Sequence, residues 1–304
     1  MALRCTSEHT RRLRLRVRKR RSLTGSRTPP SREALADVLS CVLDLDGTLL
    51  DSSHRVSART AEGLLRLDEL GCLIILASSR APVAFRAVLR QLPPLKSLRV
   101  VAAQGAMTAK CVTNRLVPLH TDAIHISAAQ EAVSAISRIA PSTPVNWFTS
   151  DAWLASGMDR GVEREAVLIG SEPQVANLLA EEDPPLKLMV VTEGYASSVA
   201  IAAAIRNLEL EASLSHTNYV EITALGIDKA RAVKRLCSEA GVRMSRVLAV
   251  GDGENDVGLL RLAGFSAAPA NASPVALTTA EWQISSNDDD GPADLILRLV
   301  DALS

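Results

Sequence analysis

Aromatic residues, long apolar runs and a secretory signal are scarce or missing in this 304-residue sequence. Only 3% of the residues are aromatic, so the core must be built mainly from aliphatic side chains, which a hydrophobic content of 47% can supply. No apolar run approaches the roughly 20 residues of a membrane span. No apolar stretch follows the N-terminal arginines, as a signal peptide would require. We therefore expect no association with a membrane.

The cysteines form no pattern typical of disulfides or zinc sites. Five of them are scattered along the chain, and no two stand at CxxC spacing. An odd number at irregular spacing fits reduced thiols better than a disulfide framework. We predict a cytoplasmic protein whose cysteines act as small hydrophobic residues.

The net charge is zero overall, but the charge is unevenly distributed. Residues 1–30 hold ten basic residues and one acidic residue, a net charge of +9, so the other 274 residues carry −9. This arm could be a tail for nucleic acid or an anionic surface, or an Arg-rich transit peptide. It could also have no role, or result from a start codon chosen too far upstream. We predict a disordered extension over residues 1–37 and do not expect nucleic acid as the main partner, although the arm leaves that open.

Apolar runs alternate with helical patterns after the arm. We predict strands at residues 41–44, 72–77 and 98–103, separated by helices at 57–70 and 82–92. This βαβαβ order predicts an α/β fold with a Rossmann-like, doubly wound parallel sheet.

The pattern changes between residues 118 and 222, where we predict an inserted α/β (α+β) domain. The expected helices are 127–139, 172–179 and 196–208. The expected strands are 145–149, 186–191 and 219–223, with 153–155 as a possible companion to the first of them. The core then resumes with a helix at 228–240, a strand at 247–250 and a helix at 254–263. The predicted core therefore comprises residues 38–117 and 223–304.

Pairs of acidic residues follow two of the predicted strands. Asp44 and Asp46 come directly after the first strand, and residues i and i+2 of an extended segment point to the same side. Asp252 and Asp256 follow the strand at 247–250 through a glycine-rich turn. Open α/β sheets bind ligands at the carboxyl ends of their strands. Clustered carboxylates repel one another unless a cation or a proton compensates, so a hard cation such as Mg²⁺ is expected here.

Two residues with affinity for anions lie between the acidic pairs. Ser78 follows the second strand, where its hydroxyl and backbone N–H could face an anion. Lys229 opens the helix after the insertion and offers a positive charge to a phosphate oxygen. Alone, these are weak signals, because Ser78 could be a plain helix cap and Lys229 a solvated helix residue.

These pieces together resemble the haloacid dehalogenase superfamily of phosphohydrolases. The resemblance is carried by the Asp-x-Asp-Gly-Thr segment at 44–48, Ser78, Lys229 and the Gly-Asp-Gly-Glu-Asn-Asp segment at 251–256. The insertion looks like the α/β cap of the Cof-type (subclass IIB) sugar-phosphatase branch, and the segments 269–272 and 286–291 match that branch as well. The similarity spans roughly residues 40 to 300. Ser79 and Gln104 replace the Gly and Asn that are common in the family, as Ala230 replaces Gly.

The resemblance implies a role for each motif. Asp44 would be the nucleophile that forms an aspartyl-phosphate, and Asp46 would be the general acid and base. Mg²⁺ would be held by Asp44, the backbone carbonyl of Asp46 and Asp252, with Asp256 supporting them. The residues implied in phosphate binding are Ser78, Lys229 and Asn255.

The sequence gives weaker indications of the substrate. Residues considered for substrate contact are Gly105, His216, Asn218 and Asn271, with Tyr219, Trp147 and Trp153 as further candidates in the cap. The expected function is Mg²⁺-dependent hydrolysis of a small phosphorylated metabolite, such as a sugar phosphate. The alternatives are a phosphosugar mutase of the same fold and a non-enzymatic binding protein that uses the basic arm. Nothing in the sequence indicates the oligomeric state.

Overall fold

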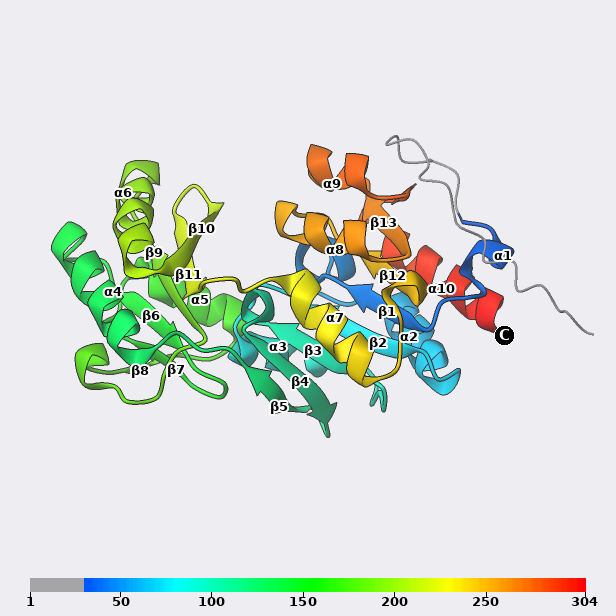
Figure 1. Cartoon of the computed structure of the whole chain (residues 1–304), viewed down its shortest axis with the longest axis horizontal. Coiled ribbons are helices and arrows are strands. Elements are labelled where there is room, and N and C mark those ends of the chain that lie inside the picture. The colour runs from blue at the N-terminus through cyan, green and yellow to red at the C-terminus, as the bar shows by residue number, and fades with distance from the viewer. Residues whose placement is uncertain (1–29) are drawn as a thin grey trace, which may run out of the picture.

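A computed structural model describes residues 30–304 of the chain (Figure 1). Most of the predicted arm lies outside these residues. Its last part, expected to be disordered, contains the short helix α1 (Arg32–Leu35). Leu35 is fully buried in the main hydrophobic core, which explains why this segment is ordered.

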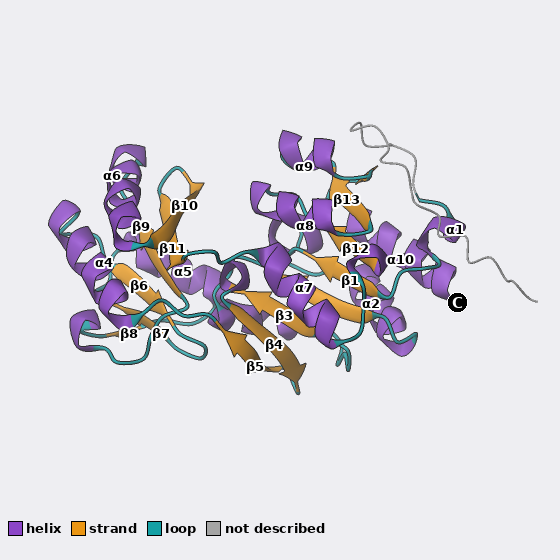
Figure 2. Cartoon of the chain, in the orientation of Figure 1, coloured by secondary structure: helices purple, strands orange, loops and turns teal. Residues whose placement is uncertain are grey.

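The larger of two sheets has the strand order β14-β13-β12-β1-β2-β3-β4-β5 (Figure 2). Its six strands from β14 to β3 are parallel, and β4 and β5 add an antiparallel edge. The strands are β1 (Ser40–Leu43), β2 (Leu73–Ala77), β3 (Arg99–Ala102), β4 (Met107–Val112), β5 (Arg115–Thr121), β12 (Val247–Val250), β13 (Phe265–Pro269) and β14 (Trp282–Ile284).

Helices cover both faces of this sheet. One face packs against α2 (Ala58–Glu69), α3 (Phe85–Leu89) and α10 (Gly291–Leu303), and the other against α7 (Lys229–Glu239), α8 (Val257–Leu262) and α9 (Pro274–Thr279). Side chains alternate as a strand requires, because Cys41 and Leu43 enter the first core while Val42 enters the second. The predicted doubly wound α/β fold is confirmed.

The second sheet belongs to the cap and has the order β10-β11-β9-β6-β7-β8. Its strands are β6 (Val145–Phe148), β7 (Trp153–Ala155), β8 (Gln174–Val175), β9 (Lys187–Val191), β10 (Leu210–His216) and β11 (Tyr219–Ala224). Helices α4 (Ile126–Ile139) and α6 (Tyr195–Ile205) cover one face, as Figure 1 shows.

The other face of the cap sheet meets the core. Phe148, Trp153 and the neighbouring apolar side chains of the cap form a cluster with Ala81, Val83 and Ala84, which lie just beyond β2. The segment 82–84 is a 3₁₀ turn that leads into α3. The cap therefore packs against the part of the core that directly follows Ser78.

Several elements differ from the sequence prediction, which also placed no strand or helix after residue 263. The hairpin of β4 and β5 and the strand β10 were not expected, and the helix predicted at 172–179 does not form. A helix forms instead at α5 (Arg160–Ile169), where Asp159 caps the first turn and Gly170 ends the helix in a left-handed conformation. Within residues 30–304, no helix combines the length and the apolar character needed to cross a membrane.

The thiols of the folded core should react slowly with alkylating agents. Cys41, Cys72 and Cys237 are buried, and burial raises the pKa of Cys72 to about 12 and that of Cys237 to about 11. Because the thiolate is the reactive form, we expect iodoacetamide at pH 8 to label the half-buried Cys111 first among the four cysteines of residues 30–304. Peptide mass spectrometry would follow each site, and urea should remove the differences. Rapid labelling of Cys41 in the folded protein would contradict the described packing.

Candidate active site

The turn after β1 begins the site. Asp44 continues the strand, and its N–H donates to the carbonyl of Val250 in the neighbouring strand β12 (3.0 Å). Gly47 then adopts a left-handed conformation with φ of +70°, so that the chain turns back toward the sheet. Asp44 is therefore fixed at the carboxyl edge of the sheet, next to the end of β12.

Glycine at position 47 also makes room for Asp252. A Cβ atom there would lie 2.5 Å from Oδ2 of Asp252. The next residue, Thr48, is fully buried and donates from its hydroxyl to Oδ1 of Asp252 (2.9 Å). Sequence reasoning did not assign a role to Thr48, although it belongs to the Asp-x-Asp-Gly-Thr motif.

Lys229 lies at the centre of a buried charge cluster. Its Nζ donates to Oδ1 of Asp44 and to Oδ1 of Asp256, each at 2.7 Å. Burial alone would lower the pKa of Lys229, but the two carboxylates outweigh it and raise that pKa above its ordinary value. Asp256 also accepts from the N–H of Gly253, and Gly251 leaves the space its carboxyl group occupies.

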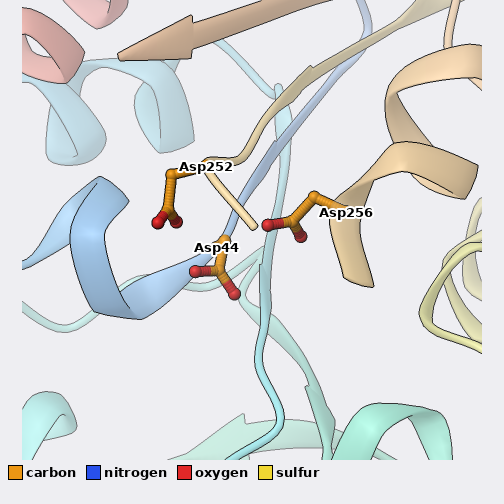
Figure 3. A group of neighbouring side chains, drawn as sticks. All are labelled: Asp44, Asp252 and Asp256. Atoms are coloured by element: carbon orange, nitrogen blue, oxygen red, sulfur yellow. The ribbon is translucent and has the colours of Figure 1, made fainter. Parts of the chain in front are cut away.

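The acidic residues lie close enough to share a cation. Asp44, Asp252 and Asp256 each offer an oxygen, and these oxygens lie within 4.8 Å of one another (Figure 3). Burial raises the pKa of Asp44 and of Asp252, and the neighbouring carboxylates add to the rise. Three acids facing one lysine leave an excess of negative charge, and hard oxygen ligands are those that Mg²⁺ prefers. The donor set therefore fits a magnesium ion.

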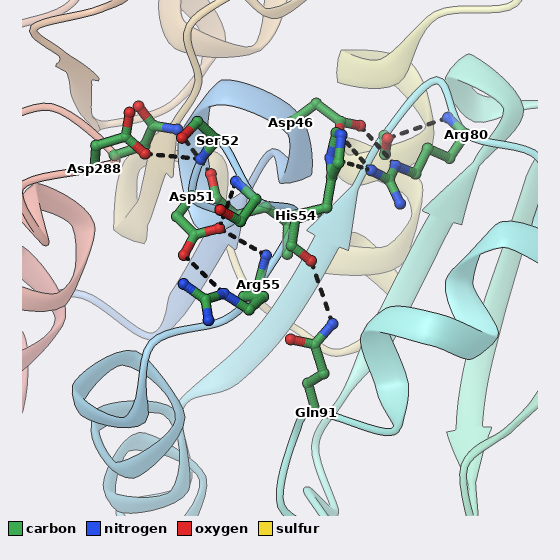
Figure 4. Close-up of polar contacts among 12 residues, drawn as sticks. Asp46, Asp51, Ser52, His54, Arg55, Arg80, Gln91 and Asp288 are labelled. Atoms are coloured by element: carbon green, nitrogen blue, oxygen red, sulfur yellow. Dashed lines mark hydrogen bonds and ion pairs between the residues drawn. The ribbon is translucent and has the colours of Figure 1, made fainter. Parts of the chain in front are cut away.

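The carboxylate of Asp46 does not join this group of acids but pairs with Arg80 (Figure 4). Both of its oxygens accept from the guanidinium of Arg80, with 2.7 Å between Nε and Oδ2. His54 lies beside the pair, its Nδ1 3.5 Å from Oδ1 of Asp46. The side chain of Asp46 is thus outside the metal-ligand group, where only its backbone carbonyl was expected to contribute. Sequence analysis did not single out Arg80, because its pairing with Asp46 could not be read from the sequence.

The loop of Ser78, Ser79 and Arg80 differs from the prediction that the backbone N–H of Ser78 faces an anion. The N–H of Ser78 donates to the carbonyl of Val101 (2.9 Å) and is not free for an anion. The Ser78 hydroxyl is buried and accepts from the N–H of Arg80 (3.1 Å), and its own proton stays available. Within the described residues, the N–H of Ser79 has no hydrogen-bond partner and takes the place expected for that of Ser78.

Three other candidate residues contact the protein itself. The exposed Asn255 donates to Oε1 of Gln104 (3.4 Å). Gly105 packs so closely on the start of α7 that a Cβ would lie 2.7 Å from the carbonyl oxygen of Asp228. Asn271 donates to the carbonyl of Gly47 (2.7 Å) and accepts from the N–H of Asn287, so it holds the catalytic turn in place.

The cap candidates divide into two groups. Trp147 and Trp153 are buried in the cap. The indole N–H of Trp147 donates to the carbonyl of Asp183, and that of Trp153 to Oδ1 of Asn146. Neither side chain therefore faces a ligand, contrary to the prediction. Tyr219 donates its hydroxyl to Glu165 (2.7 Å). His216 and Asn218 lie at the turn between β10 and β11, and their contact with substrate stays a prediction.

Comparison with known proteins agrees with this geometry. The sequence model of the haloacid dehalogenase-like hydrolases matches residues 41–296, so the chain belongs to that family. A 5-amino-6-(5-phospho-D-ribitylamino)uracil phosphatase of Bacillus subtilis is 25% identical over 276 residues, which are 87% of this chain and 96% of the relative. A phosphoglycolate phosphatase of Methanothermobacter thermautotrophicus is 22% identical, with coverage of 85% and 97%. The predicted family and enzyme class, a phosphatase, are confirmed.

Solved structures share the fold. A haloacid dehalogenase-like hydrolase from Bacteroides thetaiotaomicron superimposes with a TM-score of 0.77 at 23% identity, covering 86% of this chain and 99% of that one. A sugar phosphatase of haloacid dehalogenase subclass IIB gives a TM-score of 0.68 at 17% identity, with coverage of 84% and 96%. The arrangement of core and cap is thus that of a known group of structures.

Replacing Gly47 by Ala should damage the site more than the fold. Gly47 and Gly71 have similar positive φ angles (+70° and +78°), but only Gly47 has a neighbour that a Cβ would meet. Both substitutions should cost about 1–2 kcal/mol of stability in urea unfolding, from backbone strain. Gly47→Ala should also displace Asp252 and lower phosphatase activity at least tenfold. Equal activity of the two variants would show that the contact with Asp252 is unimportant.

Proposed function

We propose that this chain is a Mg²⁺-dependent phosphomonoester hydrolase that acts on a small phosphorylated metabolite through an aspartyl-phosphate on Asp44. The observation that carries the proposal is the position of Asp44. It is buried at the carboxyl edge of the sheet, ion-paired with Lys229 and grouped with Asp252 and Asp256. A carboxylate nucleophile beside a phosphate dianion needs this supply of positive charge.

Asp44, Asp252 and the backbone carbonyl of Asp46 would hold the metal, with Asp256 behind them. Bound there, Mg²⁺ would offset the repulsion between the Asp44 carboxylate and the phosphate. Lys229, the Ser78 hydroxyl and the Ser79 N–H would contact the phosphoryl oxygens and fix the phosphorus for in-line attack, and Asn255 is a further candidate at the rim.

The reaction then has two steps. An oxygen of Asp44 bonds to phosphorus while the bond from phosphorus to the alcohol oxygen breaks, and Asp46 gives that oxygen a proton. In the second step Asp46 takes a proton from water, the water oxygen bonds to phosphorus, and Asp44 leaves as a carboxylate. The guanidinium of Arg80 would hold the Asp46 carboxyl group in one orientation through both steps.

The cap would select the leaving group. The two relatives described above are named for phosphorylated metabolites of low molecular mass, which supports a substrate of that class. We propose His216 and Asn218, at the β10–β11 turn, as its contacts, and retain Gly105 and Asn271 only as supports of the surrounding backbone. A cytoplasmic location is part of the same proposal.

Replacing the nucleophile tests the chemistry directly. We expect Asp44→Asn to lower phosphate release by at least about 10³-fold, because an amide cannot form the acyl-phosphate. EDTA should abolish the activity of the unmodified protein, and added Mg²⁺ should restore it. Asp37→Asn is a suitable control, since that side chain is 85% exposed. The assay would measure free phosphate from a panel of phosphorylated metabolites, and equal release by Asp44→Asn and the unmodified protein would refute the assignment.

The pairing of Arg80 with Asp46 leads to a further expectation. Arg80→Gln should lower kcat by roughly 10- to 100-fold, because loss of the two-pronged contact leaves the Asp46 carboxyl group without a fixed orientation. Arg55→Gln serves as the matched control, because Arg55 pairs with Asp51 and its side chain is 72% exposed. Steady-state kinetics on one substrate would compare the variants. An unchanged kcat in Arg80→Gln would exclude an orienting role.

A further inference from the structure

A buried lysine of the cap is bonded to the core beside the phosphate site. Lys187 is the first residue of β9, and only 3% of it is exposed. Its Nζ lies 2.7 Å from Oε1 of Glu221 in the adjacent strand β11 and 3.1 Å from the backbone carbonyl oxygen of Ser79. The ammonium group therefore joins the cap sheet to a loop of the core.

The alternation of side chains along β9 explains this position. Leu188 and Val190 point into the cap's own core under α4 and α6. Met189 and Val191 point the other way, into the cluster shared with Ala81, Val83 and Ala84. Lys187 shares the side of Met189 and Val191 because strand residues two apart lie on one face, so it faces the core.

The loop that Lys187 reaches is otherwise held by the core alone. The Ser78 N–H donates to Val101, and the Ser78 carbonyl accepts from Gln104. The Arg80 carbonyl accepts from Ala103. Among the described residues, the carbonyl of Ser79 is the one backbone group of this loop that is bonded to the cap. It lies between the residue proposed to bind phosphate and the residue that holds Asp46.

From this geometry we infer that Lys187 is a positioning residue, which fixes the loop of Ser78, Ser79 and Arg80 from the cap side. The inference rests on the proposed phosphatase function. The peptide group that contributes the Ser79 carbonyl also contains the N–H of Arg80, which donates to the Ser78 hydroxyl. Its orientation therefore affects both the Ser78 hydroxyl and the start of the Arg80 side chain. Glu221 in turn holds the Lys187 ammonium in place through their ion pair.

Stability alone does not account for this ion pair. Both side chains are buried, and Oε2 of Glu221 has no hydrogen-bond partner within the described residues. Removing two charges from water costs free energy that their attraction often fails to recover, and apolar replacements of such pairs are frequently as stable or more stable. A role in positioning the loop supplies a reason for a lysine at this place.

The double variant Lys187→Met/Glu221→Leu separates positioning from folding. Lys187→Met alone leaves Glu221 as an unpaired buried carboxylate and loses stability for that reason, whereas the double variant replaces the whole pair by apolar groups of similar size. We expect it to keep the urea midpoint of the unmodified protein within experimental error. Arg86→Met is the matched control, because Arg86 makes another contact between core and cap, to the carbonyl of Asp151, away from the loop.

Two readouts test the inference. With Mg²⁺ present, calorimetry should show inorganic phosphate binding about tenfold more weakly to the double variant, and KM for p-nitrophenyl phosphate should rise by a similar factor. Arg86→Met should change neither value. If the unmodified protein hydrolyses phosphate esters and the folded double variant binds phosphate equally well, the positioning role is refuted. If the unmodified protein releases no phosphate from any ester, it is the proposed function that fails.

Discussion

The ion pairs between Lys229 and the two carboxylates of Asp44 and Asp256 are the contacts on which the rest of this site depends. They join the first residue of α7 to Asp44, which follows β1, and to Asp256, in the short 3₁₀ turn before α8. Without the ammonium group, the carboxylates buried here would repel one another and take up protons. The ammonium group opposes the rise that burial and the neighbouring acids cause in the pKa of Asp44, and so favours the ionised form that the proposed nucleophile requires. The turn at Gly47 and the space left at Gly251 are local requirements of the same arrangement.

A second set of contacts surrounds this buried cluster and orients it. Thr48 holds Asp252, Arg80 holds Asp46, and Asn271 holds the carbonyl of Gly47. These neighbours come from separate elements of the core, so the catalytic turn is fixed from several directions. The cap adds the contact of Lys187 with Ser79. Preorganisation of this kind lets fixed charges act on a reacting phosphate without rearranging first.

Strand-end motifs were the part of the site that the sequence could predict. Asp44 and Asp252 follow short apolar runs that alternate with helical segments and so indicate buried strands, and parallel strands bring their carboxyl ends to one edge. The partner of Asp46 could not be foreseen in this way, because pairing with Arg80 depends on the directions of two side chains 34 positions apart. The same holds for Lys187 and Ser79, which are separated by 108 positions.

In the fold, too, some elements could be predicted from the sequence and others could not. Strongly periodic segments such as α2, α4 and α7 were predicted nearly to their ends. The helix expected at 172–179 failed because an apolar pattern does not by itself show where a helix begins. Asp159 and Gly170, which cap and end the real helix α5, were the better local signals. The hairpin β4–β5 is exposed on much of its surface and so has little of the apolar alternation that reveals a strand.

The return path of the chain from the cap has a mechanical consequence. Strand β11, which contains Glu221, ends at Ala224, and α7 begins at Lys229. Only four residues separate the cap sheet from Lys229, which is ion-paired with Asp44, and one of them, Gly226, has a φ of +72°. Any rotation of the cap must be absorbed within this short tether and within residues 122–125 on the outward path. Because the tether ends at Lys229, any strain that such a rotation placed on it would act directly on the ion pair between Lys229 and Asp44.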